Sequence, residues 1–590
     1  MYSVARTGKS SIHSRFFPDP AYFQFSLIWL SVMLIARLIE LSLFIWKSGW
    51  PDTGFSLIFS SLFNDLRFLF TTLLLLYPLY WLLWHIAEGL ARWVVTGIFV
   101  ALTLMHIGLV YYYSKTSVLL GADLFGYSLA DIRQTVGASG GFSFPVLLLV
   151  MVLTAGLTAA LWRLRHRIRP NQRWLPGLLL PGLLFLLLPA GNTIFRPGSE
   201  QLDNLSANKS GYFSTAAYTY LTASEADYET DIYALADEPV GDASAQLAQI
   251  TYSQEDQFPF LHTESTPDVL GPFFRPASTK PSIVVIIAEG LSQAFSGDEA
   301  PLGSFTPFLD SLADRSLHWN HFLSEGGRTF AVLPSILGSL PFAKNGFSEL
   351  GPAMPPHLSL TNILKTNGYR TAFYYGGNAV FDNMNTLLRR QGIDRINDQA
   401  SFGKQYRKMP GNESFTWGYG DKELVRNFFD LNAASAGPSL QVLLTLSTHD
   451  PFLTNETGQY LRRFEKRMNE LGLSEPEKQT HRAYRMPYAS VLYLDDALKN
   501  FFAAYRQRPD FQNTIFLITG DHRLPEIPML SKIDRYHVPL IIYSPLLRQP
   551  ARFRSVSTHF DIAPSLLAYL RENYQLRTPS QVAWMGTGLD

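Results

Sequence analysis

Long apolar runs alternate with short polar breaks over the first 190 residues, and the pattern then changes. The runs predict five membrane helices, near residues 23–47, 62–84, 92–113, 143–162 and 174–190. Each run is close to the ~20 apolar residues that span a bilayer as a helix. Aromatic residues fall near the predicted helix ends, as is typical of the membrane surface: Trp46, Trp84, Trp93, Tyr111, Tyr112, Tyr113 and Trp174. The pattern therefore predicts an integral membrane protein.

Basic residues predict the orientation of these helices. Arg6, Lys9 and Arg15 precede the first helix. Five arginines stand between the fourth and fifth helices: Arg163, Arg165, Arg167, Arg169 and Arg173. Such residues concentrate on the cytoplasmic side, and the four helices between the two groups put both on one side. A fifth crossing then places residues 191–590 outside the cytoplasm. We expect a multi-pass membrane protein with its C-terminal domain outside the cytoplasm.

Four ionisable residues lie in or near the predicted membrane helices: Arg37, Glu40, Asp65 and Arg67. Charged side chains are unfavourable in lipid, so they pair with one another or face polar surroundings. One interpretation is that these residues lie at the membrane surface or pair between helices. The other is that they bind a lipid headgroup or dock the outer domain.

A juxtamembrane connector is predicted at residues 191–280, between a transmembrane domain at 1–190 and a C-terminal domain at 281–590. Its apolar and aromatic segment, Gly211–Leu221, is expected to lie on the membrane surface. An acidic stretch follows, which predicts a solvated linker. Its residues are Glu225, Asp227, Glu229, Asp231, Asp237 and Glu238.

From residue 281, short apolar runs of strand length alternate with helical segments. The predicted strands are Ser282–Ala288, Thr371–Tyr375, Leu440–Leu446, Thr514–Thr519 and Val538–Tyr543. The predicted helices include Pro307–Arg315, Leu358–Asn367 and Ser490–Tyr505. This alternation predicts a largely parallel sheet covered by helices on both faces. Ligands then bind beyond the carboxyl ends of the strands.

Composition narrows the range of functions. The chain has 49 basic and 49 acidic residues, so its formal net charge of zero gives no electrostatic basis for binding nucleic acid. It contains no cysteine, which excludes disulfides, thiolate metal sites and cysteine nucleophiles.

Polar side chains follow three of the predicted strands. Glu289 comes directly after the first strand, His449 follows the third, and Asp521 with His522 follows the fourth. Adjacent Asp and His can bind one metal ion when a tight turn, here helped by Gly520, directs both inward. Each signal alone is weak, because a strand must end in something polar and most single histidines are structural. Their shared position at one edge of the sheet favours a site.

The segment Gly326-Gly327-Arg328-Thr329 supplies a candidate nucleophile. Two glycines let the backbone approach a ligand closely, and the start of a helix favours an anion. Most threonines in such a place are helix N-caps. Ser335 is a competing hydroxyl, but it follows Pro334 and lies further into the predicted helix. Thr329 is therefore the preferred nucleophile.

The ordered set Glu289, Thr329, His449 and Asp521-His522 resembles the alkaline phosphatase superfamily. Within it, the chain resembles the sulfatase-fold membrane enzymes of the lipoteichoic acid synthase and phosphoglycerol transferase type. The segments that carry this likeness also include Tyr536–Pro539, Phe560–Ser565, Thr306–Leu309, Tyr375–Asn378, Phe381–Met384 and Trp417-Gly418. The resemblance covers about residues 281–590. It implies an N-terminal five-helix transmembrane domain and a C-terminal α/β/α sandwich. It also implies a bacterial cytoplasmic (inner) membrane as the location, with the catalytic domain periplasmic or extracellular.

The resemblance also implies roles for single residues. Glu289, Thr329, Asp521 and His522 would hold one divalent metal ion, with Mn²⁺ the first expectation and Zn²⁺ or Mg²⁺ the alternatives. His449 and His537 would contact substrate phosphate, and Arg328, Asn378 and Asp382 would line the substrate site. The implied reaction moves phosphoglycerol from phosphatidylglycerol, a membrane phospholipid donor, to an extracytoplasmic glycan or glycolipid through a phosphorylated Thr329.

Several positions depart from the family pattern. Asn378 stands where many relatives have Asp. Tyr375, Asp382 and Met384 stand where the lipoteichoic acid synthases carry a His–Trp–Arg set for glycerol phosphate. The headgroup pocket is therefore expected to differ from theirs. The sequence ends at Asp590, where relatives often continue, so we expect a shortened form.

Three alternative functions are weighed against this one. Phosphoethanolamine transferases commonly carry several disulfides, so the absence of cysteine argues against that activity. A sulfatase needs a cysteine as the source of formylglycine. A catalytically inactive membrane sensor or scaffold with the same fold would have no need of the complete set of metal ligands.

Overall fold

The computed structural model describes residues 21–126, 129–138, 144–168, 175–188, 198–222, 252–254, 258–341, 350–351, 353–411, 415–432, 437–529 and 531–589. The chain divides into two compact units. The membrane unit comprises Met1–Leu124 and Phe142–Thr222, and the α/β unit comprises Phe125–Gly141 and Ala223–Asp590. Several residues used for the predictions lie outside the described ones: Arg6, Lys9, Arg15, Arg169, Arg173, Trp174 and the acidic stretch at 225–238.

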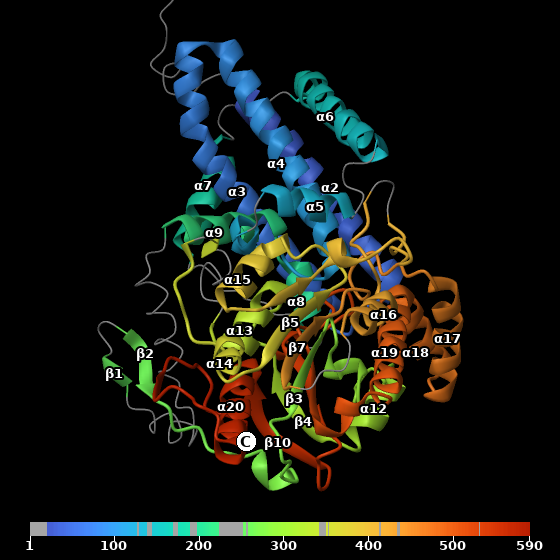
Figure 1. Cartoon of the computed structure of the whole chain (residues 1–590). Helices are drawn as coiled ribbons and strands as arrows, with labels where there is room; N and C mark the ends of the chain where they lie inside the picture. Colours follow the sequence, from blue (N-terminus) through green and yellow to red (C-terminus); the bar gives the residue numbers. More distant parts are fainter. Residues whose placement is uncertain are drawn as a thin grey trace, which may run out of the picture. The chain divides into compact units, whose positions relative to one another are not determined.

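The membrane unit contains four to five apolar helices (Figure 1). Their bounds are α2 Ala21–Ser48, α3 Gly54–Ile86, α4 Glu88–Thr116, α6 Phe144–Leu164 and α7 Leu175–Leu187, with short 3-10 turns η1 Ala122–Gly126 and η2 Arg165–Arg167. Among the described residues, α2, α3, α4 and α6 are long and apolar enough to cross a membrane. The fifth predicted crossing, 174–190, contains α7, of which the structure describes 13 residues, and residues 169–174 and 189–197 beside it lie outside the described ones. This helix packs closely on α3, because a Cβ on Gly182 would stand 2.3 Å from the carbonyl oxygen of Phe70.

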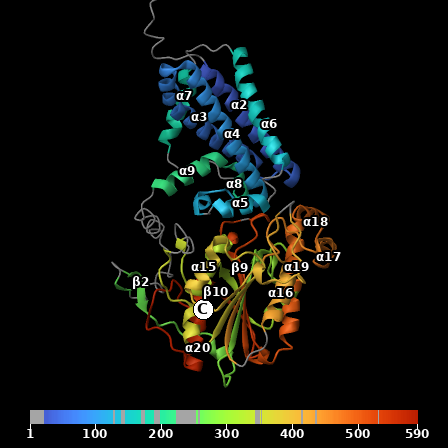
Figure 2. The ribbon, with the colours of Figure 1, turned by 45° about the horizontal axis from the view of Figure 1, so that its top comes forward.

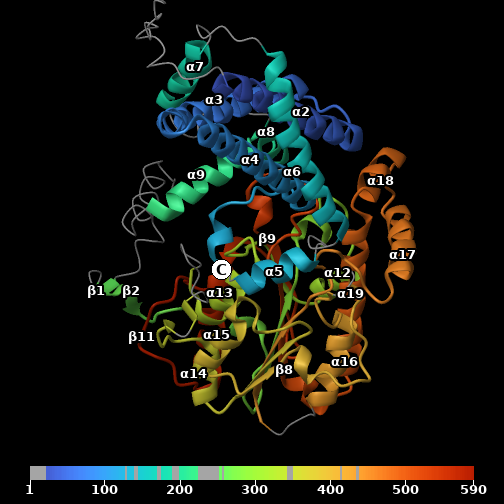
Figure 3. The same cartoon turned by 90° about the horizontal axis from the view of Figure 1, so that it is seen from above.

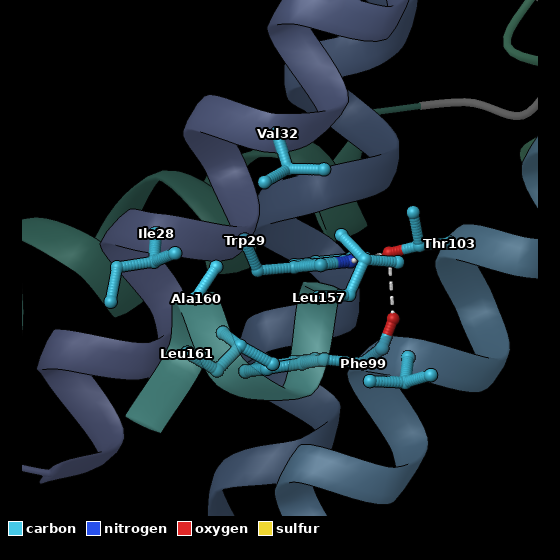
Figure 4. A pocket seen from close by; sticks show the side chains of 9 residues that line it. Ile28, Trp29, Val32, Phe99, Thr103, Leu157, Ala160 and Leu161 are labelled. Carbon is cyan, nitrogen blue, oxygen red and sulfur yellow. Dashed lines mark hydrogen bonds between the residues drawn. The ribbon is translucent and has the colours of Figure 1, made fainter. Parts of the chain in front are cut away.

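Helices α2, α4 and α6 pack around Trp29 (Figure 4). Its indole ring stacks on Phe99 with 4.7 Å between ring centroids. The indole Nε1 donates to Thr103 Oγ1 at 3.1 Å, and Thr103 donates to the Phe99 carbonyl at 2.7 Å. The small pocket beside these rings is otherwise lined by apolar side chains, including Leu157 and Leu161. The polar atoms drawn here are thus bonded inside the bundle, as helices in lipid require.

Four ionisable side chains form what we call the membrane charge cluster: Arg37, Glu40, Asp65 and Lys209. Arg37 donates to both carboxylate oxygens of Asp65 and to Glu40, each at 2.7 Å. Lys209 Nζ lies 2.7 Å from the other Glu40 oxygen. Each of the four residues is at most 8% exposed. The membrane charge cluster therefore balances two buried cations with two buried anions.

The membrane charge cluster also binds the juxtamembrane segment, which forms α8 Glu200–Ser206 and α9 Lys209–Thr222. Arg37 donates to the backbone oxygens of Leu205 at 2.7 Å and Ala207 at 2.9 Å. With its bonds to Asp65 and Glu40, all of its N–H donors are then used. The interpretation that these charges pair between helices is confirmed for Arg37, Glu40 and Asp65. Arg67 differs, because it is not buried and donates to the Leu188 carbonyl at 3.0 Å.

The predicted surface segment Gly211–Leu221 lies within α9. Lys209 and Ser210 are buried at its start, whereas Tyr212, Tyr218 and Leu221 are exposed along it. An exposed aromatic and apolar surface on a helix next to the membrane helices is typical of an interfacial helix.

The α/β unit is built on one eight-stranded sheet with the order β10-β4-β9-β8-β3-β7-β5-β6. The strands are β3 Ser282–Ala288, β4 Leu317–Leu323, β5 Arg370–Tyr375, β6 Arg395–Asn397, β7 Ser439–Leu444, β8 Thr514–Gly520, β9 His537–Tyr543 and β10 Ala551–Thr558. Strand β9 runs antiparallel to β4 and β8, and the other neighbouring pairs are parallel. The prediction of a largely parallel sheet is confirmed. A small antiparallel sheet joins β1 Tyr252–Gln254, β2 Phe258–Thr263 and β11 Gln581–Val582.

Helices cover both faces of the large sheet (Figures 2 and 3). Their bounds are α12 Pro307–Ala313, α13 Val332–Gly338, α14 Leu360–Thr366, α15 Met384–Arg390, α16 Asp421–Leu431, α17 Thr457–Glu470, α18 Glu475–Arg482, α19 Arg485–Tyr505 and α20 Ile562–Tyr574, and α5 Leu129–Ala138 belongs to the same unit. Short 3-10 turns are η4 Gly271–Phe273, η5 Gln293–Phe295, η6 Thr329–Ala331, η8 Phe381–Asn383, η9 Gln399–Ser401, η10 Pro509–Asn513, η11 Ile533–Arg535 and η12 His559–Asp561.

Strand β3 shows why its sequence is continuously apolar. Ile283, Val285 and Ile287 pack in one core with α13, α14 and α20. Val284 and Ile286 pack in the other core with α12, α16 and α19. Successive side chains of a strand point to opposite faces, so a strand covered on both faces needs apolar residues at every position. The α/β unit is an α/β/α sandwich.

Candidate active site

Two neighbouring strands deliver the acidic part of the site. Ala288, the last residue of β3, pairs with Gly520, the last residue of β8. Glu289 and Asp521 follow directly, so the register of the sheet brings their side chains to the same edge. A Cβ on Gly520 would stand 1.9 Å from the Leu291 carbonyl oxygen, so a glycine is needed where the two chain segments leave the sheet.

The hydroxyl of Thr329 meets this edge from η6, the turn that leads into α13. Thr329 Oγ1 donates to Glu289 Oε2 at 2.9 Å and lies 3.4 Å from His522 Nε2. His522 Nε2 lies 3.6 Å from Glu289 Oε1 and 3.4 Å from Asp521 Oδ2. The four side chains singled out from the sequence thus converge on one point.

These residues fit a divalent metal ion. Glu289, Asp521 and His522 are buried, and one ligand atom from each lies within 4.8 Å of the other two. Asp521 Oδ1 accepts the backbone N–H groups of Gly290 and His522 at 2.8 Å, whereas Oδ2 is buried without a hydrogen-bond partner. Carboxylate oxygens with one imidazole suit Mn²⁺, Zn²⁺ or Mg²⁺.

The electrostatics of the site also favour a cation. Burial, and next the neighbouring Asp521 carboxylate, raise the pKa of Glu289 well above its usual value. His522 Nδ1 donates to the Arg523 carbonyl at 2.9 Å, which leaves the lone pair of Nε2 facing the carboxylates. A positive ion between these groups would relieve the repulsion of two buried carboxylates.

His449 follows β7 at the same edge. Its imidazole packs on the Trp417 ring with 4.1 Å between centroids. Burial lowers the pKa of His449, whereas its hydrogen bond to the Asp450 carbonyl, at 3.2 Å from Nδ1, and the nearby carboxylates act in the opposite direction. The imidazole is thereby held between an aromatic ring and the acidic group.

The end of β5 supplies a further part of the site. Burial raises the pKa of Tyr375, and the carboxylates of Glu289, Asp382 and Asp521 raise it further. The Tyr375 hydroxyl therefore lies within electrostatic reach of both the acidic group and Asp382. Asn378 accepts the N–H of Val380 at 3.0 Å and shapes the loop that follows β5. Asp382 has a φ of 53°, a conformation that Asp tolerates and that often marks functional loops.

Two other predicted substrate contacts are placed as follows. Arg328 is half-buried and directly precedes Thr329. His537 starts β9, and its Nε2 lies 2.6 Å from the Asn320 carbonyl oxygen, to which it donates. His537 Nε2 is therefore already occupied by a backbone hydrogen bond. A contact between His537 and substrate phosphate stays a prediction.

Two residues near the site were missed in the sequence. Arg535 lies against Gly327, and burial raises the pKa of Glu526 to about 8 while one of its carboxylate oxygens has no hydrogen-bond partner. Arg535 stands two residues before His537, and Glu526 four residues after His522. Those short distances along the chain were the available signal.

The candidate site lies within the part of the chain that matches a known protein family. Residues 281–572 match the family model described as Sulfatase. The chain is 24% identical over 315 residues to the lipoteichoic acid synthase-like protein YvgJ of Bacillus subtilis, covering 49% of this chain and 47% of that protein. It is 24% identical over 310 residues to phosphoglycerol transferase I of Xanthomonas campestris pv. campestris, covering 50% and 42%. It is 24% identical over 270 residues to the lipoteichoic acid synthase of Staphylococcus aureus, covering 44% and 38%. The chain thus spans less than half the length of each of these relatives.

Solved structures show weaker likeness. A protein of the alkaline phosphatase superfamily from Vibrio parahaemolyticus is 22% identical with a TM-score of 0.42, covering 54% of this chain and 72% of that one. The lipoteichoic acid synthase LtaP of Listeria monocytogenes is 19% identical with a TM-score of 0.42, covering 55% and 78%.

Proposed function

We propose that the sulfatase-family domain formed by residues 281–572 is a metal-dependent phosphotransferase. It moves a phosphoglycerol group from phosphatidylglycerol to an extracytoplasmic glycan or glycolipid. The observation that carries this proposal is the Thr329 hydroxyl, held 2.9 Å from Glu289 and beside His522 at the end of β8. The names of the relatives support the phosphoglycerol group, and the apolar helices support a lipid donor.

Metal ligation in this proposal uses Glu289, Thr329, Asp521 and His522. A divalent ion held there, Mn²⁺ first with Zn²⁺ and Mg²⁺ as alternatives, would lower the pKa of the Thr329 hydroxyl and offset charge on a phosphate oxygen.

The first half-reaction forms a bond between Thr329 Oγ1 and phosphorus and breaks the bond from phosphorus to the diacylglycerol oxygen. Thr329 gives up its proton to solvent and attacks as the alkoxide, while Glu289 stays ionised as a metal ligand. His449 gives a proton to the leaving oxygen. Burial lowers the pKa of His449, and the negative charge of the bound donor offsets this effect.

The second half-reaction reverses these steps. An acceptor hydroxyl attacks the phosphorylated Thr329, and its proton passes to His449. The bond between phosphorus and Thr329 breaks, and Thr329 recovers its proton from solvent. Tyr375 and Asp382 offer a hydroxyl and a carboxylate to the glycerol hydroxyls, in place of the His–Trp–Arg set of the lipoteichoic acid synthases.

The test uses the detergent-solubilised full chain with Mn²⁺ and phosphatidylglycerol. We expect release of diacylglycerol and a phosphoglycerol adduct on the Thr329 peptide by mass spectrometry. Faster diacylglycerol release from phosphatidylethanolamine would replace the phosphoglycerol assignment with phosphoethanolamine transfer. A purified protein that binds no metal and releases no diacylglycerol would favour the inactive scaffold.

A further inference from the structure

We propose that Arg535 binds the phosphate group that Thr329 attacks and offsets the negative charge that builds on its oxygens during transfer. This inference rests on the proposed function and adds a residue to the same site. It begins with the position of η11, the turn that ends at Arg535.

The backbone around Arg535 is bonded to both halves of the candidate site. Ser324, which begins the loop to Thr329, donates its N–H to the Tyr536 carbonyl at 2.7 Å. Arg523, which follows His522, donates its N–H to the Arg535 carbonyl at 3.2 Å. Arg535 is thereby fixed between the nucleophile loop and the metal-ligand loop.

The side chain of Arg535 rests on the nucleophile loop. A Cβ built on Gly327 would stand 2.4 Å from Arg535 Nε and 3.0 Å from Nη2. Gly327 lies two residues before Thr329. The guanidinium group therefore occupies the space that any side chain at position 327 would need, which explains the second glycine of the Gly326-Gly327 pair.

The Arg535 guanidinium is also available for a ligand. Among the residues that the structure describes, it has no hydrogen bond or ion pair. Arg523 differs, because it is only 3% exposed, donates to the carbonyl oxygens of Ile527 and Pro528, and lies 3.7 Å from Asp534. Arg535 is half-buried, so its planar group is partly desolvated and still reachable.

The charges of the site call for such a group. Glu289 and Asp521 bring two negative charges, which one divalent ion would balance. A phosphodiester then adds one negative charge, and more accumulates on its oxygens in the transition state. An arginine presents paired N–H donors to phosphate oxygens, and its charge persists at all working pH values.

The experiment compares Arg535→Gln, Arg535→Lys, Gly327→Ala and the double variant Arg535→Gln/Gly327→Ala. The control is Arg554→Gln, because Arg554 is an exposed arginine on β10. Gly327 does not have a positive φ, so alanine fits its backbone, and the three atoms nearest to the added Cβ all belong to the Arg535 guanidinium. Diacylglycerol release from phosphatidylglycerol in mixed micelles, bound metal, and the affinity of the Mn²⁺-loaded protein for inorganic phosphate are measured.

We expect Arg535→Gln to lower kcat/KM on the order of 10²-fold and to weaken phosphate binding, with bound metal unchanged. Arg535→Lys should keep part of the activity, and added guanidinium should partly restore Arg535→Gln. Gly327→Ala should reproduce the loss although Arg535 is present. The double variant should be no worse than Arg535→Gln alone, since both changes remove the same interaction. Arg554→Gln should behave as wild type.

The two proposals fail in different ways. Wild-type kcat/KM and phosphate affinity in Arg535→Gln, beside an inactive Thr329→Ala, would overturn the role of Arg535 and leave the proposed function intact. A wild-type protein that acts on no phospholipid would overturn the proposed function, and the phosphate affinities would still decide the role of Arg535. If Arg535→Gln does not fold, Arg535→Lys and Gly327→Ala decide it, and full activity in both would refute the inference.

Discussion

Removing the Thr329 hydroxyl should abolish the reaction without preventing the protein from folding. We expect Thr329→Ala to lower diacylglycerol release by roughly 10³-fold or more, because no other hydroxyl replaces the nucleophile. The variant should fold and should bind Mn²⁺ more weakly, since one ligand is lost. Thr329→Ser keeps the hydroxyl and is the matched control. Equal activity of wild type and Thr329→Ala would remove Thr329 from the mechanism.

The acidic group at the ends of β3 and β8 makes metal binding depend on pH. Chelation should inactivate the enzyme, and Mn²⁺ should restore it best. The pKa of Glu289 is raised, so without metal its carboxyl stays protonated to a higher pH than usual. Metal binding requires the carboxylate, so apparent affinity should fall as pH falls through this raised pKa, and binding should release a proton.

Calorimetric titration with Mn²⁺ in buffers of different ionisation enthalpy counts the released proton. Glu289→Gln should bind Mn²⁺ weakly and without that proton release. Full activity after exhaustive chelation would contradict the metal requirement, and proton-free binding by wild type would contradict the role of Glu289.

The sequence predicted some residues of the site better than others for a physical reason. Glu289 and Asp521 each follow a buried strand directly, so their place depends on strand ends that apolar runs reveal. Arg535 depends on bonds from Ser324 and Arg523, which are distant in sequence from one another. The local pattern shows only that Arg535 stands two residues before His537, and it does not contain these long-range bonds.

Some strands were predicted from the sequence and others were missed, for the same reason as the site residues. The predicted strand at 282–288 agrees with β3 residue for residue. Strand β4 was missed because His318 and Asn320 interrupt its apolar pattern, although both are buried. Strand β10 was missed because Arg552 and Arg554 alternate with partly buried residues at the edge of the sheet. Neighbouring strands, rather than local preference, determine both elements.

The membrane charge cluster gives a prediction for helix packing. Arg37→Met leaves the buried Asp65 without its bidentate partner, which should lower the free energy of unfolding by about 3–5 kcal/mol. The double variant Arg37→Met/Asp65→Leu should recover most of this loss, because Glu40 and Lys209 remain paired. Thermal unfolding in detergent measures both effects.

Arg92→Gln is the control for this comparison. In its ion pair with Glu88 the two side chains are 26% and 58% exposed, so the pair should contribute no more than about 1 kcal/mol. A double variant as unstable as Arg37→Met alone would show that the contacts of Arg37 to the carbonyls of Leu205 and Ala207 matter more than its pairing with Asp65.

The number of helices that cross the membrane determines on which side the α/β unit lies. We expect the α/β unit outside the cytoplasm, because the basic residues before α2 and after α6 indicate the cytoplasmic side. This arrangement requires α7 to cross. A reporter that works only outside the cytoplasm should be active when fused after residue 220 and silent when fused at residue 168. The reverse result would put the α/β unit inside the cell and exclude an outer-leaflet donor.

The close packing of α7 on α3 also links α7 to the tilt of a long helix. The 33 residues of α3 rise about 50 Å, against a hydrocarbon thickness of ~30 Å, so α3 is expected to tilt. A Cβ on Gly182 would stand 2.3 Å from the Phe70 carbonyl oxygen, so α7 lies against the backbone of α3 and should follow its tilt. The hydrophobic thickness of the bilayer should therefore affect the packing of both helices, and the thermal stability of the protein should differ between vesicles of short-chain and of long-chain lipids.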